Sequence, residues 1–181
     1  TSPHTLSLHD ALPISIQSAG GRDGGGERPG VMLSGILPPP MILLETLEHF
    51  GLRVAANDIA ALKRSYAYQP AETGDPETYY EDFYRNHYPC TTILPSADRR
   101  VDTIRRMVRE RDVKGFIFIG EKFCEYEYFE IPEMEKMLRK EGVQVLQLEM
   151  SMDDILNLDA YRTRIEAFSE MLCQGRQCKE A

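Results

Sequence analysis

The sequence has no continuous apolar run of the length that a membrane-spanning helix needs, about 20 residues. It also lacks a basic excess, because 21 Lys and Arg stand against 29 Asp and Glu, which gives a formal net charge of −8. This balance argues against a nucleic-acid-binding surface, which needs a basic face. The 181 residues, 42% of them apolar, suit one globular domain. We therefore expect a protein that contacts neither membrane nor nucleic acid.

Cysteine is scarce, and the four residues are Cys90, Cys124, Cys173 and Cys178. They lack the density of a secreted disulfide framework, and no apolar signal segment precedes them. This pattern favours a cytoplasmic location, where thiols are free, catalytic or bound to metal. The four histidines have no partner at a metal-binding spacing and are interpreted as surface residues.

The glycine-rich motifs of nucleotide-binding proteins are also missing. No GxGxxG opens the first expected helix, and no P-loop lysine pattern occurs. The sequence therefore does not support binding of a dinucleotide or a nucleoside triphosphate by those devices.

The first 30 residues are predicted to stand outside the fold. Residues 5–14 read TLSLHDALPI, which matches the translation of a common sequencing-adapter end, and residues 16–30 carry six glycines without periodicity. We interpret residues 1–30 as a non-native leader and a disordered junction. Residues 31–181 are then expected to form the C-terminal α/β domain of a longer subunit.

From Val31 onward, apolar runs alternate with amphipathic segments. Expected strands are VMLSG, LRVAAND, GFIFIG and VQVLQLEM; expected helices are MILLETLEHF, a Tyr-rich segment ending before Pro89, ADRRVDTIRRMVRERD, a segment starting at Pro132, and DAYRTRIEAFSEMLC. The aromatic face of the Tyr-rich segment is expected to dock on the core. This alternation predicts a three-layer flavodoxin-like or Rossmann-like α/β domain with a four-stranded, mainly parallel sheet.

Ligands of such sheets bind beyond the carboxyl ends of the strands. That rule places three loops on the functional edge of the sheet: SGILPPP, NDIAALKRSY and GEKFCEYEYF. Cys124 lies in the third loop, and Cys90 is able to reach the same edge. On spacing alone an inert thiol is the commoner outcome for Cys124. For Cys173 and Cys178 a frayed end is favoured over a ligand pair.

Several motifs together resemble one family. The run VKGFIFIGEKFCEYEYFEIPEMEKMLRKEGVQVLQLEM is followed by YRTRIEAFSEML, and SGILPPP, LEHFGLRVAAND and YPCTTILPSADRR precede it in order. Over about residues 31–172 the chain is similar to the C-terminal part of the 2-hydroxyacyl-CoA dehydratase and benzoyl-CoA reductase family, in particular to a dehydratase D-component.

The resemblance implies an iron–sulfur enzyme subunit. In that family a "KFC" cysteine binds a [4Fe–4S] cluster, which implies Cys124 as a metal ligand; Cys90 aligns with a second cysteine that only some subunits use. The implied partners are a homologous second subunit, an ATP-dependent iron–sulfur activator protein and an acyl-CoA substrate. The implied reaction begins when the cluster passes one electron to the thioester, which forms a ketyl radical. The enzyme would then be a lyase or an aromatic-ring reductase, and its source an anaerobic organism.

The resemblance also implies that the remaining ligand cysteines belong to an upstream domain, so that this chain alone is inactive. The alternative from another class is a non-catalytic flavodoxin-like binding or scaffold subunit with structural cysteines. The sequence does not choose between dehydratase and reductase.

Overall fold

A computed structural model describes residues 28–72, 74–87, 97–151 and 159–173. Its centre is a sheet of four parallel strands in the order β2-β1-β3-β4. The strands are β1 (Gly30–Gly35), β2 (Arg53–Ile59), β3 (Val113–Glu121) and β4 (Gln144–Met150). The predicted α/β fold with a four-stranded parallel sheet is therefore confirmed.

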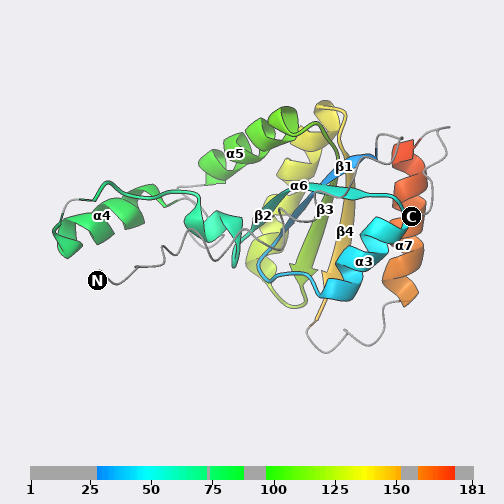
Figure 1. Ribbon diagram of the computed structural model, residues 1–181, viewed down its shortest axis with the longest axis horizontal. Coiled ribbons are helices and arrows are strands. Elements are labelled where there is room, and N and C mark those ends of the chain that lie inside the picture. Colours follow the sequence, from blue (N-terminus) through cyan, green and yellow to red (C-terminus); the bar gives the residue numbers. More distant parts are fainter. Residues whose placement is uncertain (1–27, 73, 88–96, 152–158, 174–181) are drawn as a thin grey trace, which may run out of the picture.

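Helices cover both faces of this sheet and make it the middle of three layers (Figure 1). Helices α3 (Met41–His49) and α7 (Asp159–Cys173) lie on one face; α5 (Ala97–Glu110) and α6 (Glu125–Lys140) lie on the other. All six residues of β1 are buried, as expected for a central strand covered on both sides.

Side chains alternate between the two faces along each strand, which divides the core into two clusters. From β1, Val31 and Leu33 pack with α3 and α7, whereas Met32 packs with α5 and α6. The most buried residues of these helices are Leu43 and Leu47 in α3, Ile104 in α5, Met134 and Leu138 in α6, and Ile165 and Phe168 in α7.

Helix α6 begins seven residues earlier than predicted. It starts at Glu125, so Pro132 stands inside the helix instead of at its first turn. Proline removes one main-chain hydrogen bond from a helix interior. Here the acidic side chains of Glu125 and Glu127 lie at the positive N-terminal end of the helix dipole, which stabilises a helix starting at this point. Burial of Ile131 stabilises the turn before the proline. The acidic and aromatic residues after Cys124 are therefore helical and do not form a loop.

The Tyr-rich segment does form a helix, α4 (Pro76–Asn86), but it does not dock on the core. None of its side chains is buried, and Tyr80 and Tyr84 are 58% and 71% exposed. The helix is stabilised locally, since Asp75 caps its first turn and Tyr68 donates to Asp82 at 2.7 Å. In Figure 1 it extends away from the sheet, beyond the short 3-10 helix η1 (Lys63–Tyr66).

Within the described ranges, no helix combines the length and the apolar character that crossing a membrane requires. Of the predicted leader and junction at residues 1–30, residues 1–27 fall outside those ranges, and Gly30 is the first residue of β1.

Candidate functional site

The order of the strands defines where a ligand site is expected. The chain moves outward from β1 to β2 on one side and from β3 to β4 on the other, so the change of direction falls between β1 and β3. Open parallel sheets bind ligands outside the carboxyl ends of their strands at this position. The three loops predicted at this edge do follow the ends of β1, β2 and β3. We call this edge the rim.

Cys124 lies on the rim, three residues after the end of β3. A tight turn carries it there: the Cys124 N–H donates to the carbonyl of Glu121 at 3.1 Å, and the Lys122 N–H donates to the carbonyl of Met150 at 2.9 Å. Cys124 is the N-cap residue of α6, yet its thiol makes no capping hydrogen bond. The thiol is free and partly exposed, which leaves it available for a ligand.

The residue before Cys124 adopts an unusual backbone conformation. Phe123 has φ 68°, in the left-handed region, which costs a residue with a bulky side chain roughly 1–2 kcal/mol. Its side chain is 96% exposed, so no packing within the described chain compensates for this cost. The turn is thus strained at the point where it presents the thiol.

Glu127 lies beneath the turn and holds both of its ends. Its backbone N–H donates to the carbonyl of Cys124 at 3.2 Å, while its carboxylate accepts from the N–H of Glu121 at 3.3 Å. The residue is only 1% exposed, and burial raises the pKa of its carboxyl group. Within the described chain, the second carboxylate oxygen has no hydrogen-bond partner.

Tyr128 packs against the same strand end. Burial, together with the nearby carboxylates of Glu149 and Glu127, raises the pKa of Tyr128 to about 12. A Cβ atom on Gly120 would lie 2.6 Å from the Tyr128 hydroxyl, so β3 needs glycine there to let this ring approach. Strand β3 and the first turn of α6 are therefore in close contact just below Cys124.

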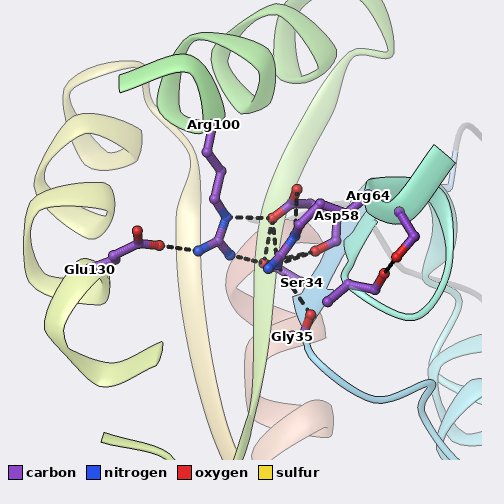
Figure 2. Close-up of polar contacts among 8 residues, drawn as sticks. Ser34, Gly35, Asp58, Arg64, Arg100 and Glu130 are labelled. Carbon is purple, nitrogen blue, oxygen red and sulfur yellow. Dashed lines mark hydrogen bonds and ion pairs between the residues drawn. The ribbon is translucent and has the colours of Figure 1, made fainter. Parts of the chain in front are cut away.

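A buried charged cluster lies at the ends of β1 and β2 (Figure 2). Ser34 and Asp58 are paired across the two strands, and the Ser34 hydroxyl donates to the Asp58 carboxylate at 3.0 Å. Arg64 of η1 donates to both carboxylate oxygens of Asp58, at 3.2 and 2.9 Å. Arg100 of α5 donates to Asp58 at 3.0 Å and to Ser34 at 3.1 Å.

The cluster continues from α5 to α6. Arg100 forms an ion pair with Glu130, as Figure 2 shows, so one guanidinium joins β2, α5 and α6. Burial by itself lowers the pKa of Arg100, but the carboxylates of Asp58 and Glu130 outweigh it and the pKa is raised. This arrangement keeps a positive charge inside the protein beside the first half of α6.

A recess opens on the rim at the change of direction in the sheet. It has a volume of about 230 Å³ and is lined by Leu37, Pro38, Pro39, Pro40, Ile119, Glu121, Met150 and Ser151. The three prolines and the apolar side chains give it a largely apolar wall, and Glu121 links it to the Cys124 turn. It suits an apolar group better than a phosphate.

The other predicted cysteines do not join Cys124 in the described structure. Cys90 and Cys178 lie outside the described residues. Cys173 is the last residue of α7, is buried, and is disulfide-bonded. The prediction of a frayed end was therefore wrong for Cys173, because the apolar face of α7 continues to this residue.

The described residues do not complete a metal site. No three His, Cys, Asp or Glu side chains in them are arranged to hold a metal ion. An iron–sulfur cluster is held by about four ligands, usually thiolates. Cys124 suits one such ligand by its chemistry and exposure. A cluster bound there would need its other ligands from outside the described residues.

The sequence pattern predicted the place of Cys124 but not the buried cluster at the ends of β1 and β2. One signal was present: Arg100 falls on the apolar stripe of α5, four residues before Ile104 and seven before Met107. A second signal was the placement of Ser34 and Asp58 at the ends of two expected strands. Their mutual contact depends on the strand register, which the sequence alone does not show.

These features define an α/β domain with a free thiol on the ligand-binding edge of its sheet. The chain belongs to the family described as 2-hydroxyglutaryl-CoA dehydratase, D-component, whose family model matches residues 6–172. This confirms the resemblance to acyl-CoA dehydratases.

Two curated relatives share the similarity. The (R)-phenyllactyl-CoA dehydratase beta subunit of Clostridium sporogenes is 31% identical over 142 residues, which cover 78% of this chain and 37% of the relative. The lactoyl-CoA dehydratase subunit beta of Anaerotignum propionicum is 22% identical over 143 residues, which cover 78% and 38%. The chain thus spans less than two fifths of the length of these relatives.

Proposed function

We propose that this chain is the C-terminal α/β domain of an iron–sulfur subunit of a 2-hydroxyacyl-CoA dehydratase, a lyase. In this proposal Cys124 supplies one thiolate ligand to a [4Fe–4S] cluster, with Cys90 as a second candidate. The bound cluster would supply one electron to the acyl-CoA thioester, giving a ketyl radical from which the hydroxyl group departs. In this proposal the domain by itself is inactive, because the remaining cluster ligands belong to an upstream domain.

The position of Cys124 carries this proposal. Its thiol is free, partly exposed and placed on the rim by a hydrogen-bonded turn, at the edge where open parallel sheets bind ligands. An inert structural cysteine belongs more naturally among apolar side chains. The apolar recess, which shares Glu121 with this turn, offers space for an acyl chain on the same rim.

The comparisons favour a dehydratase over a benzoyl-CoA reductase, because both relatives carry dehydratase names. Both are also named as beta subunits, which supports a second subunit as partner. An ATP-dependent activator protein and an acyl-CoA substrate complete the proposal, in a cytoplasmic and anaerobic setting.

The iron content of cysteine variants tests the ligand assignment. The complete subunit, purified anaerobically and reconstituted with iron and sulfide, is expected to bind four irons in the wild type. Cys124→Ser is expected to lower the bound iron and to change the electron paramagnetic resonance signal of the reduced protein. Cys90→Ser tests the second candidate in the same assay, and Tyr126→Phe, at an exposed residue two positions after Cys124, serves as a control without a thiol.

An unchanged iron content and spectrum in Cys124→Ser would refute the assignment. That result would favour the alternative, a non-catalytic binding or scaffold subunit with structural cysteines. The buried, disulfide-bonded Cys173 is the observation that supports this alternative, because it shows one cysteine of the chain in a structural role.

A further inference from the structure

The turn that presents Cys124 is strained at Phe123. Besides the hydrogen bond from Cys124 to Glu121 within the turn, main-chain hydrogen bonds between described residues join it to the end of β4 and to the first turn of α6. The orientation of the Cys124 thiol therefore depends on where the N-terminal half of α6 is held.

Helices α5 and α6 are joined by ion pairs at two separate places. Near the Cys124 end, Arg100 pairs with Glu130. At the far end of α6, Arg105 and Arg109 pair with Glu141, at 2.9 and 3.0 Å. The two glutamates are similarly buried, with side chains 15% and 17% exposed. The same kind of contact thus occurs once near the thiol and once far from it.

Only the contact near the thiol is anchored in the core. Arg100 is 2% exposed and also donates to Asp58 and Ser34, so its position is set by the paired ends of β1 and β2. Arg105 is more exposed, and besides Glu141 it pairs with the exposed Asp102 on its own helix. Charge-assisted hydrogen bonds between buried groups are stronger than those on the surface.

A second buried group lies between the Arg100 pair and the turn. Glu127, one helical turn before Glu130, lies in the electrostatic field of Arg100 and Arg64 and accepts the N–H of Glu121. The two arginines therefore attract Glu127 in the first turn of α6, and Arg100 also holds Glu130 in the second turn. The contacts form one continuous path from Asp58 through Arg100 and α6 to Cys124.

We propose that Glu130, held by Arg100, is a positioning residue for Cys124: this ion pair fixes the first turn of α6 and thereby the orientation of the thiol on the rim. The importance of that orientation rests on the proposed function, in which Cys124 binds the cluster. The positioning itself is a property of the metal-free chain.

The test compares Glu130→Gln with Glu141→Gln in the full chain without iron. The two variants make the same change, one in the first half of α6 near Cys124 and one at the C-cap of this helix, far from it. Two quantities are measured: hydrogen exchange of the amides of residues 121–127, and the rate at which iodoacetamide alkylates Cys124, followed by peptide mass spectrometry. Neither measurement requires a cluster or catalytic activity.

Glu130→Gln is expected to speed both processes at least about tenfold, because a lost charge-assisted hydrogen bond makes opening of the turn more frequent. Glu141→Gln is expected to leave residues 121–127 unchanged and to speed exchange near residue 140. Arg100→Lys, which keeps a positive charge beside Glu130, is expected to have a smaller effect than Arg100→Met. Since Glu130→Gln leaves the Asp58–Arg100 pair in place, this variant is expected to fold.

Unchanged exchange and alkylation in Glu130→Gln would overturn the proposal. So would equal effects of Glu130→Gln and Glu141→Gln, since these would indicate a general loss of helix stability. A failed positioning test with lowered iron in Cys124→Ser would refute only the positioning role. A successful positioning test with unchanged iron in that variant would refute only the ligand assignment.

Discussion

The Arg100 guanidinium donates to the Asp58 carboxylate at 3.0 Å, although 42 residues separate them in the chain. Both residues are 2% exposed, so neither charge is solvated by water. The same carboxylate also accepts from Arg64 and Ser34. One buried carboxylate thus holds together the ends of two strands, a 3-10 helix and α5.

Replacing Asp58 is expected to destabilise the protein strongly. In Asp58→Asn, Arg64 and Arg100 stay buried and positively charged, but the carboxylate that balanced their charges is gone. We expect this change to lower the free energy of unfolding by about 3–5 kcal/mol. Urea unfolding of the full chain, followed by circular dichroism, measures this change in the free energy of unfolding. Asp102→Asn is the control, because Asp102 is exposed and its pair with Arg105 contributes about 0.5 kcal/mol at most. Similar losses in both variants would contradict the importance of the buried pair.

Replacing Phe123 by glycine is expected to stabilise the protein. Glycine removes the strain of φ 68°, roughly 1–2 kcal/mol, and loses about 0.5–1 kcal/mol to the greater entropy of the unfolded chain. The net gain in the free energy of unfolding is therefore about 0.5 kcal/mol. The 77% exposed Phe129 lies inside α6, where the same change is expected to destabilise by a similar amount. Thermal melts of both variants should shift in opposite directions, and a lower melting temperature for Phe123→Gly would show that the ring is needed.

The cap of α4 is expected to weaken in acid. Hydrogen bonds from the Thr78 side chain and backbone lower the pKa of the Asp75 carboxyl below its ordinary value of 3.8. Because the folded protein binds this proton less tightly than the unfolded chain does, the cap contributes fully above pH 3.8 and is lost as the pH falls through the lowered pKa. Hydrogen exchange of the amides of Glu77 and Thr78, measured from pH 5 downward, follows this loss. The amide of Asn does not titrate, so in Asp75→Asn the exchange protection of these two amides should not fall with pH in this way. An identical fall in the variant would show that Asp75 is not its cause.

The apolar periodicity predicted the order of strands and helices, because burial of apolar side chains decides which segments form strands and which form helices. GFIFIG had to be a strand covered on both sides, and the inward residues of α3, α5 and α7 had to face the sheet. The same reasoning failed where burial did not decide. Tyr80 and Tyr84 have the spacing of a core face but are exposed, because α4 is held by its own cap and by Tyr68.

The predicted start of α6 was wrong for a related reason. Proline favours the first turn of a helix, so Pro132 indicated a helix starting there. In the structure the charges of Glu125 and Glu127 and the burial of Ile131 outweigh the hydrogen bond that proline removes. Local preference was overridden by packing against β3.

The sequence by itself determined the parallel α/β sheet and the place of Cys124 at its carboxyl edge, since the order of apolar segments and the handedness of crossovers leave few other arrangements. It also carried the motifs that identify the dehydratase family. Only the tertiary structure decided what surrounds Cys124. The contacts of Arg100 with Asp58 and with Glu130 join residues 42 and 30 positions apart, and they depend on strand register and helix packing that no local pattern encodes.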